Sequence, residues 1–244
     1  MNAIAIIPAR YASTRLPGKP LLDQTGMPLI QHVVQAVSAA TSVQKIVVAT
    51  DDDRIAEAVK AFGGDCVMTR ADHPSGTDRL AESAEKLALA DDDIVVNVQG
   101  DEPEMPGACV DQLVDLLVSG DCPMATLATP LGYEEAGDPN KVKVVLRGDG
   151  RALYFSRSRI PCDRDSDRQG SYLLHLGIYA YRVAFLKRYA ALPPTAAEQS
   201  EKLEQLRALE SGFDIAVGVT DYHGRGIDTP EDYEEFIARY GARG

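Results

Sequence analysis

Residues 4–20 read IAIIPARYASTRLPGKP, a short apolar run followed by a cationic loop. An apolar run of this length fits a central strand covered on both faces better than a buried helix. Prolines and a glycine in the remainder prevent a helix and give the loop a rigid backbone. Arg10, Arg15 and Lys19 lie within ten residues, on a chain whose net charge is −12.

The cationic loop follows the carboxyl end of the predicted strand, which is where open α/β sheets bind their ligands. Guanidinium, ammonium and backbone N–H groups together suit an anion such as a phosphate. An ordinary solvated loop would explain the three cations equally well, but it would not need so rigid a frame. The loop is not a P-loop, and no G-x-G-x-x-G follows a strand, which disfavours a dehydrogenase.

Strand-like and helix-like apolar patterns alternate along the rest of the chain. Strand-like runs occur at residues 46–50, 94–99, 124–127, 175–181 and 215–219, and helical spacing occurs at 29–37, 55–62, 80–88 and 110–118. A capping box at Thr195–Glu198 begins a further helix that we expect to continue through Leu209, and Thr229 and Pro230 begin the last helix. This alternation predicts an α/β fold with a mainly parallel sheet and helices on both faces.

No linker or repeat divides the 244 residues, so we expect one domain spanning residues 1–244. The pattern changes after residue 132, where strand-like runs at 142–146 and 153–155 flank the turn-forming sequence RGDGR. These features are typical of a β-hairpin. They indicate a small antiparallel excursion from the main sheet, inserted as a subregion at about residues 132–190.

Composition excludes several classes of function. An excess of 37 acidic over 25 basic residues argues against a nucleic-acid or anionic-membrane partner. No apolar run approaches the length of a membrane span, so we expect a cytoplasmic protein with no membrane insertion. The four cysteines are far apart and form no C-x-x-C pair, which favours reduced structural thiols over a metal site or disulfides.

Asp101 follows the predicted strand at residues 94–99 and is preceded by Gly100. A carboxylate at the end of a buried strand is well placed to hold Mg²⁺ beside bound phosphates. Because Mg²⁺ keeps phosphate oxygens and waters as its other ligands, one or two aspartates are enough. Asp101 is therefore the first predicted magnesium ligand, and Glu102 is a weaker candidate because adjacent residues at a strand end point apart.

Seven segments resemble the motifs of the 3-deoxy-D-manno-octulosonate (Kdo) cytidylyltransferase family, also called CMP-Kdo synthetases. They are PARYASTRLPGKP at 8–20, SGTDR at 75–79, VNVQGDEP at 96–103, ALYFSR at 152–157, HLGIY at 175–179, LEQLR at 203–207 and DTPED at 228–232. The segments extend over nearly the whole chain. The resemblance implies a nucleotide-diphospho-sugar transferase-like fold and a nucleotidyltransferase that uses CTP and Mg²⁺ to convert Kdo to CMP-Kdo for lipopolysaccharide biosynthesis.

The resemblance also implies a set of nucleotide-binding residues. They are Pro8, Ala9, Arg10, Arg15, Lys19, Arg70, Ser75, Gly76, Thr77 and Gln99. The catalytic roles would belong to Lys19, Arg10, Arg15 and Asp101. From the residues alone, Ser75 or Thr77 is explained more simply as the N-cap of a helix.

The sugar site implied by the resemblance consists of Gln99, Arg157, His175, Tyr179, Glu204 and Gln205. Asp228 would be the second magnesium ligand, and the antiparallel region would help to form a homodimer. From the residues alone, His175 fits a satisfied core histidine, Glu204 fits a solvated helix face, and Asp228 could simply support the cap of the last helix.

Three alternatives stay open at this point. The segment Cys162–Leu174 departs from the family pattern, so the same reaction on 8-amino-8-deoxy-Kdo remains an alternative. A sialic acid or another nonulosonic acid is disfavoured by RLPGK at residues 15–19. A non-catalytic nucleotide-binding protein on the same fold is a remoter alternative, which an assay of magnesium-dependent pyrophosphate release would distinguish.

Overall fold

The computed structural model describes residues 1–12, 16–73, 75–164 and 171–241. These residues form one sheet whose strands are β1 (Ala3–Ala9), β2 (Lys45–Thr50), β3 (Asp65–Met68), β4 (Ile94–Asn97), β5 (Met124–Leu131), β6 (Lys143–Leu146), β7 (Ala152–Ser156), β8 (Tyr172–Arg182) and β9 (Ile215–Val219). The α-helices are α1 (Leu29–Val37), α2 (Asp53–Ala61), α3 (Gly76–Lys86), α4 (Gly107–Ser119), α5 (Val183–Ala190), α6 (Ala196–Glu201), α7 (Leu206–Glu210) and α8 (Pro230–Gly241). Short 3₁₀ turns, η1 and η2, cover Lys19–Leu21 and Glu135–Gly137.

The main sheet has the strand order β3-β2-β1-β4-β8-β5-β9. Strands β1 to β4 run parallel to one another, β5 runs parallel to β9, and β8 lies antiparallel between β4 and β5. The predicted α/β fold with a mainly parallel sheet is therefore confirmed.

The predicted antiparallel excursion is the hairpin of β6 and β7, which pairs Val144 with Phe155. The hairpin joins the main sheet through the pair Lys143 and Leu174. Strand β8, although it falls within the predicted subregion at residues 132–190, lies in the middle of the main sheet. Helix α5 then covers a face of that sheet, so the hairpin itself takes up only residues 143–156.

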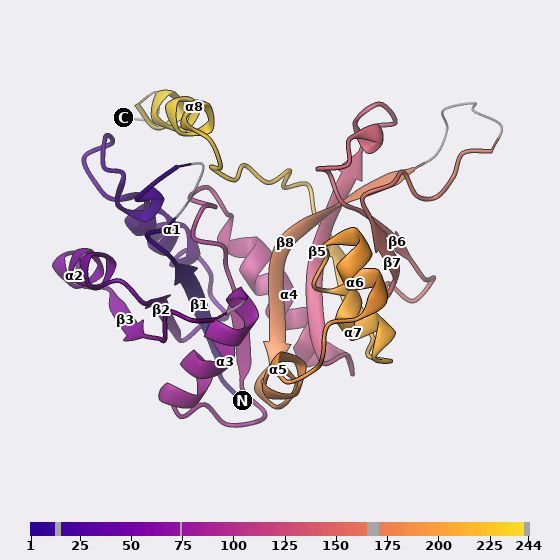
Figure 1. Cartoon of the computed structure of the whole chain (residues 1–244), viewed down its shortest axis with the longest axis horizontal. Helices are drawn as coiled ribbons and strands as arrows, with labels where there is room; N and C mark the ends of the chain where they lie inside the picture. Colours follow the sequence, from indigo (N-terminus) through magenta and orange to yellow (C-terminus); the bar gives the residue numbers. More distant parts are fainter. Residues whose placement is uncertain (13–15, 74, 165–170, 242–244) are drawn as a thin grey trace.

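Helices cover both faces of the sheet, as Figure 1 shows, and an apolar layer lies on each face. Because side chains alternate along a strand, Ala5 and Ile7 of β1 pack with helices α1, α2 and α4, whereas Ile4 and Ile6 pack with α3, α5 and α7. All four side chains are 5% exposed or less. This two-sided burial explains why the first strand is a continuous apolar run.

The helix predicted from Thr195 through Leu209 is two helices, and that prediction was wrong. Helix α6 ends at Glu201, Lys202 adopts a left-handed conformation with φ 54°, and α7 begins only at Leu206. The predicted capping box does contribute, since the Glu198 carboxylate accepts a hydrogen bond from the Thr195 backbone N–H at 3.1 Å. The break turns Glu204 and Gln205 out of a regular helix and into a connecting turn.

Helix α8 packs apart from the two main layers, at the top of the view in Figure 1. Tyr233 and Phe236 of α8 form a small buried cluster with Leu29 of α1 and with Leu16 and Ile227 of the neighbouring loops. The predicted cap is present, because the Asp232 backbone N–H donates to the Thr229 hydroxyl at 3.2 Å. This packing brings the segment before α8 next to the cationic loop after β1.

Candidate functional site

The loop after β1 is held in shape by its own backbone. Gly18 has a φ of 67°, a left-handed conformation that suits glycine, and its N–H donates to the Tyr11 carbonyl oxygen at 3.2 Å. A Cβ at this position would lie 3.3 Å from the Tyr11 ring. The turn then leads directly into η1, which begins with Lys19.

Lys19 joins the two carboxylates that were predicted to bind metal. Its Nζ lies 2.9 Å from Asp101 Oδ2 and 3.4 Å from Asp228 Oδ1, and it also donates to the Ile227 carbonyl oxygen at 2.7 Å. Asp101 follows β4 and Asp228 precedes α8, so residues far apart in sequence converge on one ammonium group. The Lys19 side chain is only 14% exposed, which strengthens these charge-assisted hydrogen bonds.

The chemistry of these two carboxylates suits a divalent metal ion. Asp101 and Asp228 both reach the same Lys19 Nζ, so one cation can contact both carboxylates. Within the described ranges there is no cluster of three or more acidic, histidine or cysteine side chains that could hold a metal. Two aspartates nevertheless suit Mg²⁺, which completes its octahedron with waters and phosphate oxygens.

Glu102 is directed elsewhere. Its carboxylate accepts a hydrogen bond from the Tyr222 hydroxyl at 2.7 Å and from the Arg225 backbone N–H at 3.3 Å. Burial raises the pKa of Glu102, and the nearby Asp101 and Asp228 charges act in the same direction. These contacts of Glu102 stabilise the loop before α8. Glu102 remains the weaker candidate for a metal ligand.

A cavity of about 420 Å³ opens beside Lys19. It collects most of the predicted nucleotide and metal residues, namely Pro8, Ala9, Arg10, Lys19, Gly76, Gln99, Asp101 and Asp228. Arg10 is oriented by a hydrogen bond from its guanidinium to the His73 carbonyl oxygen at 3.2 Å. We call this space the phosphate cavity, because its cations and carboxylates suit a metal-bound phosphate chain.

Among the described residues, Arg70, Ser75 and Thr77 are predicted nucleotide residues that do not line the phosphate cavity, and Thr77 lines a neighbouring cavity instead. Arg15 lies outside the described residues. Arg70 is exposed and pairs with Asp72 at 3.4 Å. Ser75 is the N-cap of α3, where its hydroxyl accepts from the Asp78 backbone N–H at 3.3 Å and donates to the Asp78 carboxylate at 2.6 Å.

A second cavity, of about 240 Å³, adjoins the first and shares Gly76 and Gln99 with it. Its other lining residues are Thr77, Asn97, Met124, Tyr179, Tyr181, Tyr189, Glu204 and Gln205. Four predicted sugar residues, Gln99, Tyr179, Glu204 and Gln205, thus meet in one place, and we call it the hydroxyl cavity. Burial raises the pKa of Tyr179, so its hydroxyl stays protonated near neutral pH.

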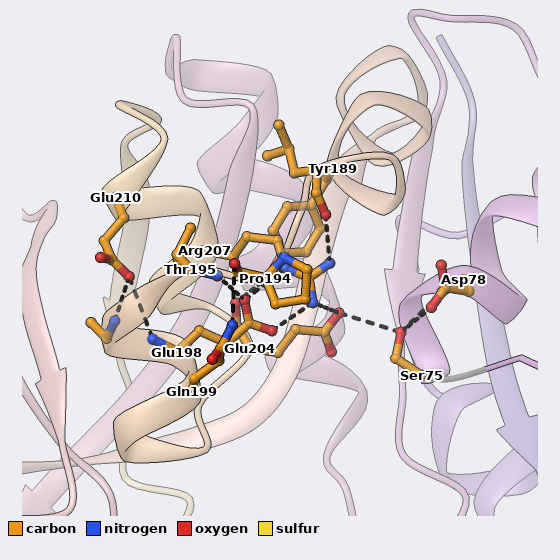
Figure 2. A network of polar contacts seen from close by, with 12 residues as sticks. Ser75, Asp78, Tyr189, Pro194, Thr195, Glu198, Gln199, Glu204, Arg207 and Glu210 are labelled. Carbon is orange, nitrogen blue, oxygen red and sulfur yellow. Dashed lines mark hydrogen bonds and ion pairs between the residues drawn. The ribbon is translucent and has the colours of Figure 1, made fainter.

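Glu204 links this cavity to Ser75 at the start of α3, and Figure 2 shows the contact. The Ser75 hydroxyl lies 3.4 Å from Glu204 Oε1, and the Arg207 guanidinium lies 3.9 Å from the same oxygen. Arg207 is itself held by Glu198 through hydrogen bonds of 2.9 and 2.5 Å. Burial raises the pKa of Glu204, while the neighbouring Thr77 hydroxyl and the Arg207 charge lower it.

Two predicted sugar residues are not among those that line the hydroxyl cavity. Arg157 donates to the backbone carbonyl oxygens of Glu201 and Pro139 at 2.7 and 3.0 Å, which ties the hairpin to α6. His175 hydrogen-bonds through Nε2 to the Thr126 hydroxyl at 3.1 Å and packs edge-on against Phe155. Burial lowers the pKa of His175 to about 3, so the ring is neutral near pH 7.

Asn97 is one of the residues lining this cavity that the sequence analysis did not assign to the site. It is 5% exposed, lines the hydroxyl cavity and was quoted only as part of a motif. One signal was available, because Asn97 is the single polar residue inside the apolar run of residues 94–98. A buried amide in a central strand needs a hydrogen-bond partner, because burying it without one is costly.

Comparisons with known proteins agree with this geometry. Residues 4–215 match the family model described as Cytidylyltransferase. A CMP:2-keto-3-deoxy-manno-octonic acid synthetase, solved as a complex with CTP, is 44% identical to the chain, with a TM-score of 0.94 over 100% of both chains. A cytidylyltransferase from Leptospira borgpetersenii serovar Hardjo-bovis (strain JB197) is 18% identical, with a TM-score of 0.66, and covers 99% of this chain and 87% of that one.

The Leptospira protein shares the fold, and the 44%-identical protein supports the resemblance first seen in the sequence motifs. That resemblance is therefore confirmed. The family model covers most of the chain, and the relative at 44% identity covers all of it. The chain belongs to the cytidylyltransferase family and is a nucleotidyltransferase.

Proposed function

We propose that the chain transfers CMP from CTP to the anomeric hydroxyl of Kdo, giving CMP-Kdo and pyrophosphate. The observation that carries this proposal is the junction of two cavities at Gly76 and Gln99, one lined by cations and carboxylates, the other by amides, tyrosines and the Glu204 carboxylate. Such a pair of cavities suits a nucleoside triphosphate and a hydroxyl-rich acceptor. The 44%-identical protein, named for this synthesis and solved with CTP, supports the choice of substrates.

In the proposed reaction the anomeric oxygen attacks the α-phosphorus of CTP, and the bond from that phosphorus to the bridging oxygen breaks. Pyrophosphate leaves with the electron pair, and the hydroxyl proton is lost to solvent. Phosphoryl-type transfer depends mainly on positioning and on neutralising charge. Arg10 and Lys19 line the phosphate cavity and would stabilise negative charge as it moves onto the leaving pyrophosphate.

Asp101 and Asp228 would hold Mg²⁺, which when bound supplies positive charge beside the phosphates. Lys19 contacts both carboxylates, so it orients them toward a common point. Gly76 presents no side chain and lines both cavities, which leaves room for the substrate where they meet. Gln99 donates its amide hydrogen to the Gly177 carbonyl oxygen at 3.1 Å and is thereby fixed at the same junction.

Ser75 and Thr77 at the start of α3, with Arg15 and Arg70, complete the proposed CTP contacts. Tyr179, Glu204 and Gln205 would bind sugar hydroxyls. Arg157 and His175 remain predicted sugar residues. The present contacts of Arg157 tie the hairpin to α6, and those of His175 join β8 to Thr126 of β5 and to Phe155 of β7.

We also propose that the chain forms a homodimer through the β6–β7 hairpin. Leu153 and Tyr154 of β7 are 54% and 38% exposed, which is unusual for large apolar side chains in neighbouring positions. None of the described helices has the length and apolar character needed to cross a membrane. We place the reaction in the cytoplasm, with its product supplied to lipopolysaccharide assembly.

The test is pyrophosphate release from CTP and Mg²⁺ with Kdo, 8-amino-8-deoxy-Kdo or N-acetylneuraminate supplied separately. We expect release with Kdo, and its loss in the Asp101→Asn variant. A preference for the amino sugar would reassign the acceptor within the same reaction. Absence of release with all three sugars would overturn the proposed reaction and favour nucleotide binding without turnover.

A further inference from the structure

The hydroxyl cavity contains a buried amide that the proposed function has not yet used. Asn97 is 5% exposed, and its Oδ1 has no hydrogen-bond partner among the described residues. Burying an acceptor in this state costs free energy, because the water bonded to it in the unfolded chain is not replaced. Native proteins satisfy most such groups, so an exception at a cavity wall points to a ligand.

The position of Asn97 in the sheet directs it into the cavity. Asn97 ends β4, where it pairs with Ile6 of β1 and Tyr179 of β8. Side chains two apart in a strand share a face, so Asn97 lies on the same face as Val95. Val95 and Tyr179 both pack in the layer of α3 and α5, and this face carries the hydroxyl cavity.

The fold itself gives no reason for an asparagine here. Ile94, Val95 and Val96 of the same strand are fully buried and apolar. Asparagine is among the residues least favoured in strands, because it neither fills the pleated surface nor finds partners there. An apolar residue of similar shape would suit this position better if packing were the only requirement.

Gln205 lines the same cavity and offers a hydrogen-bond donor there, whereas Asn97 offers an acceptor. Gln205 is 4% exposed, and its Nε2 also has no hydrogen-bond partner among the described residues. Neither lysine nor arginine occurs among the described residues that line the cavity. One free acceptor, one free donor and no cation match a neutral hydroxyl group, which both donates and accepts, better than they match a carboxylate.

We propose that Asn97 is a further sugar-recognition residue, whose Oδ1 accepts a hydrogen bond from one hydroxyl of the acidic sugar within the hydroxyl cavity. This inference rests on the proposed function. It assigns the cavity to neutral hydroxyls of the sugar and leaves the carboxylate outside it. A site built to bond a hydroxyl discriminates strongly against an analogue that lacks it, because the protein group is then left unpaired.

The experiment compares wild type with Asn97→Leu, which removes the acceptor and keeps a similar shape, and with Asn97→Ala as a second variant. Asn140→Ala is the matched control, since Asn140 is exposed in the loop before β6. Steady-state kinetics are measured with CTP, with Kdo and with a set of Kdo analogues that each lack one hydroxyl. Thermal unfolding of each free enzyme is measured alongside.

We expect both Asn97 variants to raise the KM for Kdo at least tenfold and to change the KM for CTP less than twofold. One deoxy analogue should lose at least tenfold in kcat/KM with wild type, relative to Kdo, but should lose nothing further with Asn97→Leu. The Tm of Asn97→Leu should equal or exceed that of wild type, because an orphaned acceptor has been removed.

An unchanged KM for Kdo in both variants would overturn the proposal, as would equal losses for CTP and Kdo. A fall in Tm or failure to fold in both variants would assign Asn97 a structural role and also overturn it. Failure of the proposed function is seen separately, because wild type would then show no turnover with Kdo.

Discussion

Lys19 is the residue on which the phosphate cavity depends most directly. Its ammonium holds Asp101 and Asp228 together and lines the same space as Arg10. We expect Lys19→Ala to lower kcat about 10²–10³-fold, the size of the loss when one preorganised charge-stabilising group is removed. Pyrophosphate-release kinetics measure this, with the exposed Lys45→Ala as control. An unchanged kcat would remove Lys19 from the mechanism.

The buried His175 imidazole makes the free energy of unfolding depend on pH. Burial lowers its pKa to about 3 from an ordinary value of 6.5. Below pH 6.5 the unfolded chain binds a proton that the folded protein excludes, so the stability present above pH 6.5 is lost as the pH falls toward 3. This loss amounts to about 1.4 kcal/mol at pH 5.5, one unit below the ordinary pKa.

Urea unfolding of wild type and His175→Gln at pH 7.5 and pH 5.5 tests this dependence. We expect wild type to lose about 1 kcal/mol more than the variant between the two pH values. Equal losses in the two proteins would show that His175 becomes protonated in the folded state.

The turn between α6 and α7 determines where two predicted sugar-binding residues lie. Lys202 in a left-handed conformation interrupts the helix, and the Arg207–Glu198 pair fixes the two short helices against each other. Both side chains of this pair are less than 14% exposed. The turn between them carries Glu204 and Gln205 to the hydroxyl cavity.

We expect Arg207→Ala to lower the free energy of unfolding by about 2–3 kcal/mol, because it leaves the partly buried Glu198 without its charged partner. The same variant should raise the KM for Kdo more than the KM for CTP, since Glu204 and Gln205 lose their position. Urea unfolding and steady-state kinetics measure the two effects. Lys187→Ala breaks the exposed pair with Asp91 and should cost less than about 1 kcal/mol. Equal costs in the two variants would contradict the assignment.

Local patterns identified most elements but not their neighbours in space. The apolar runs at residues 4–7 and 94–99 are strands because both of their faces are buried, and that requirement is visible in the sequence. The short strand β3 and helix α5 were not predicted. Burial in β3 is only partial, and α5 follows β8 without a loop, so neither has a clear boundary signal.

The site was predictable only in part for the same reason. The predicted metal-binding role of Asp101 rests on its position at a strand end, whereas the predicted roles of Asp228 and Glu204 rest on family motifs. The contacts that orient them, from Lys19 and from Arg207, join residues that are distant in sequence or separated by an unexpected turn. No periodicity or spacing encodes such contacts.

At the scale of the whole molecule, the hairpin provides the expected surface between two copies. Leu153→Asp would place a charge in the proposed interface and should convert a dimer to a monomer, because burying an unpaired carboxylate is costly. Sedimentation velocity measures the outcome. Val118→Asp is the matched control, since Val118 of α4 is equally exposed at 54%. A dimer that persists in Leu153→Asp would place the interface elsewhere.

The central place of β8 has a consequence for synthesis on the ribosome. Strands β1 to β4 can pair as soon as residue 97 has emerged, but β4 then has a free, apolar edge until residues 172–182 arrive. Unpaired apolar edges recruit other strands and promote aggregation. A nascent chain that stalls within this interval therefore exposes the unpaired, aggregation-prone edge of β4. We expect holdase chaperones to bind the chain at this stage.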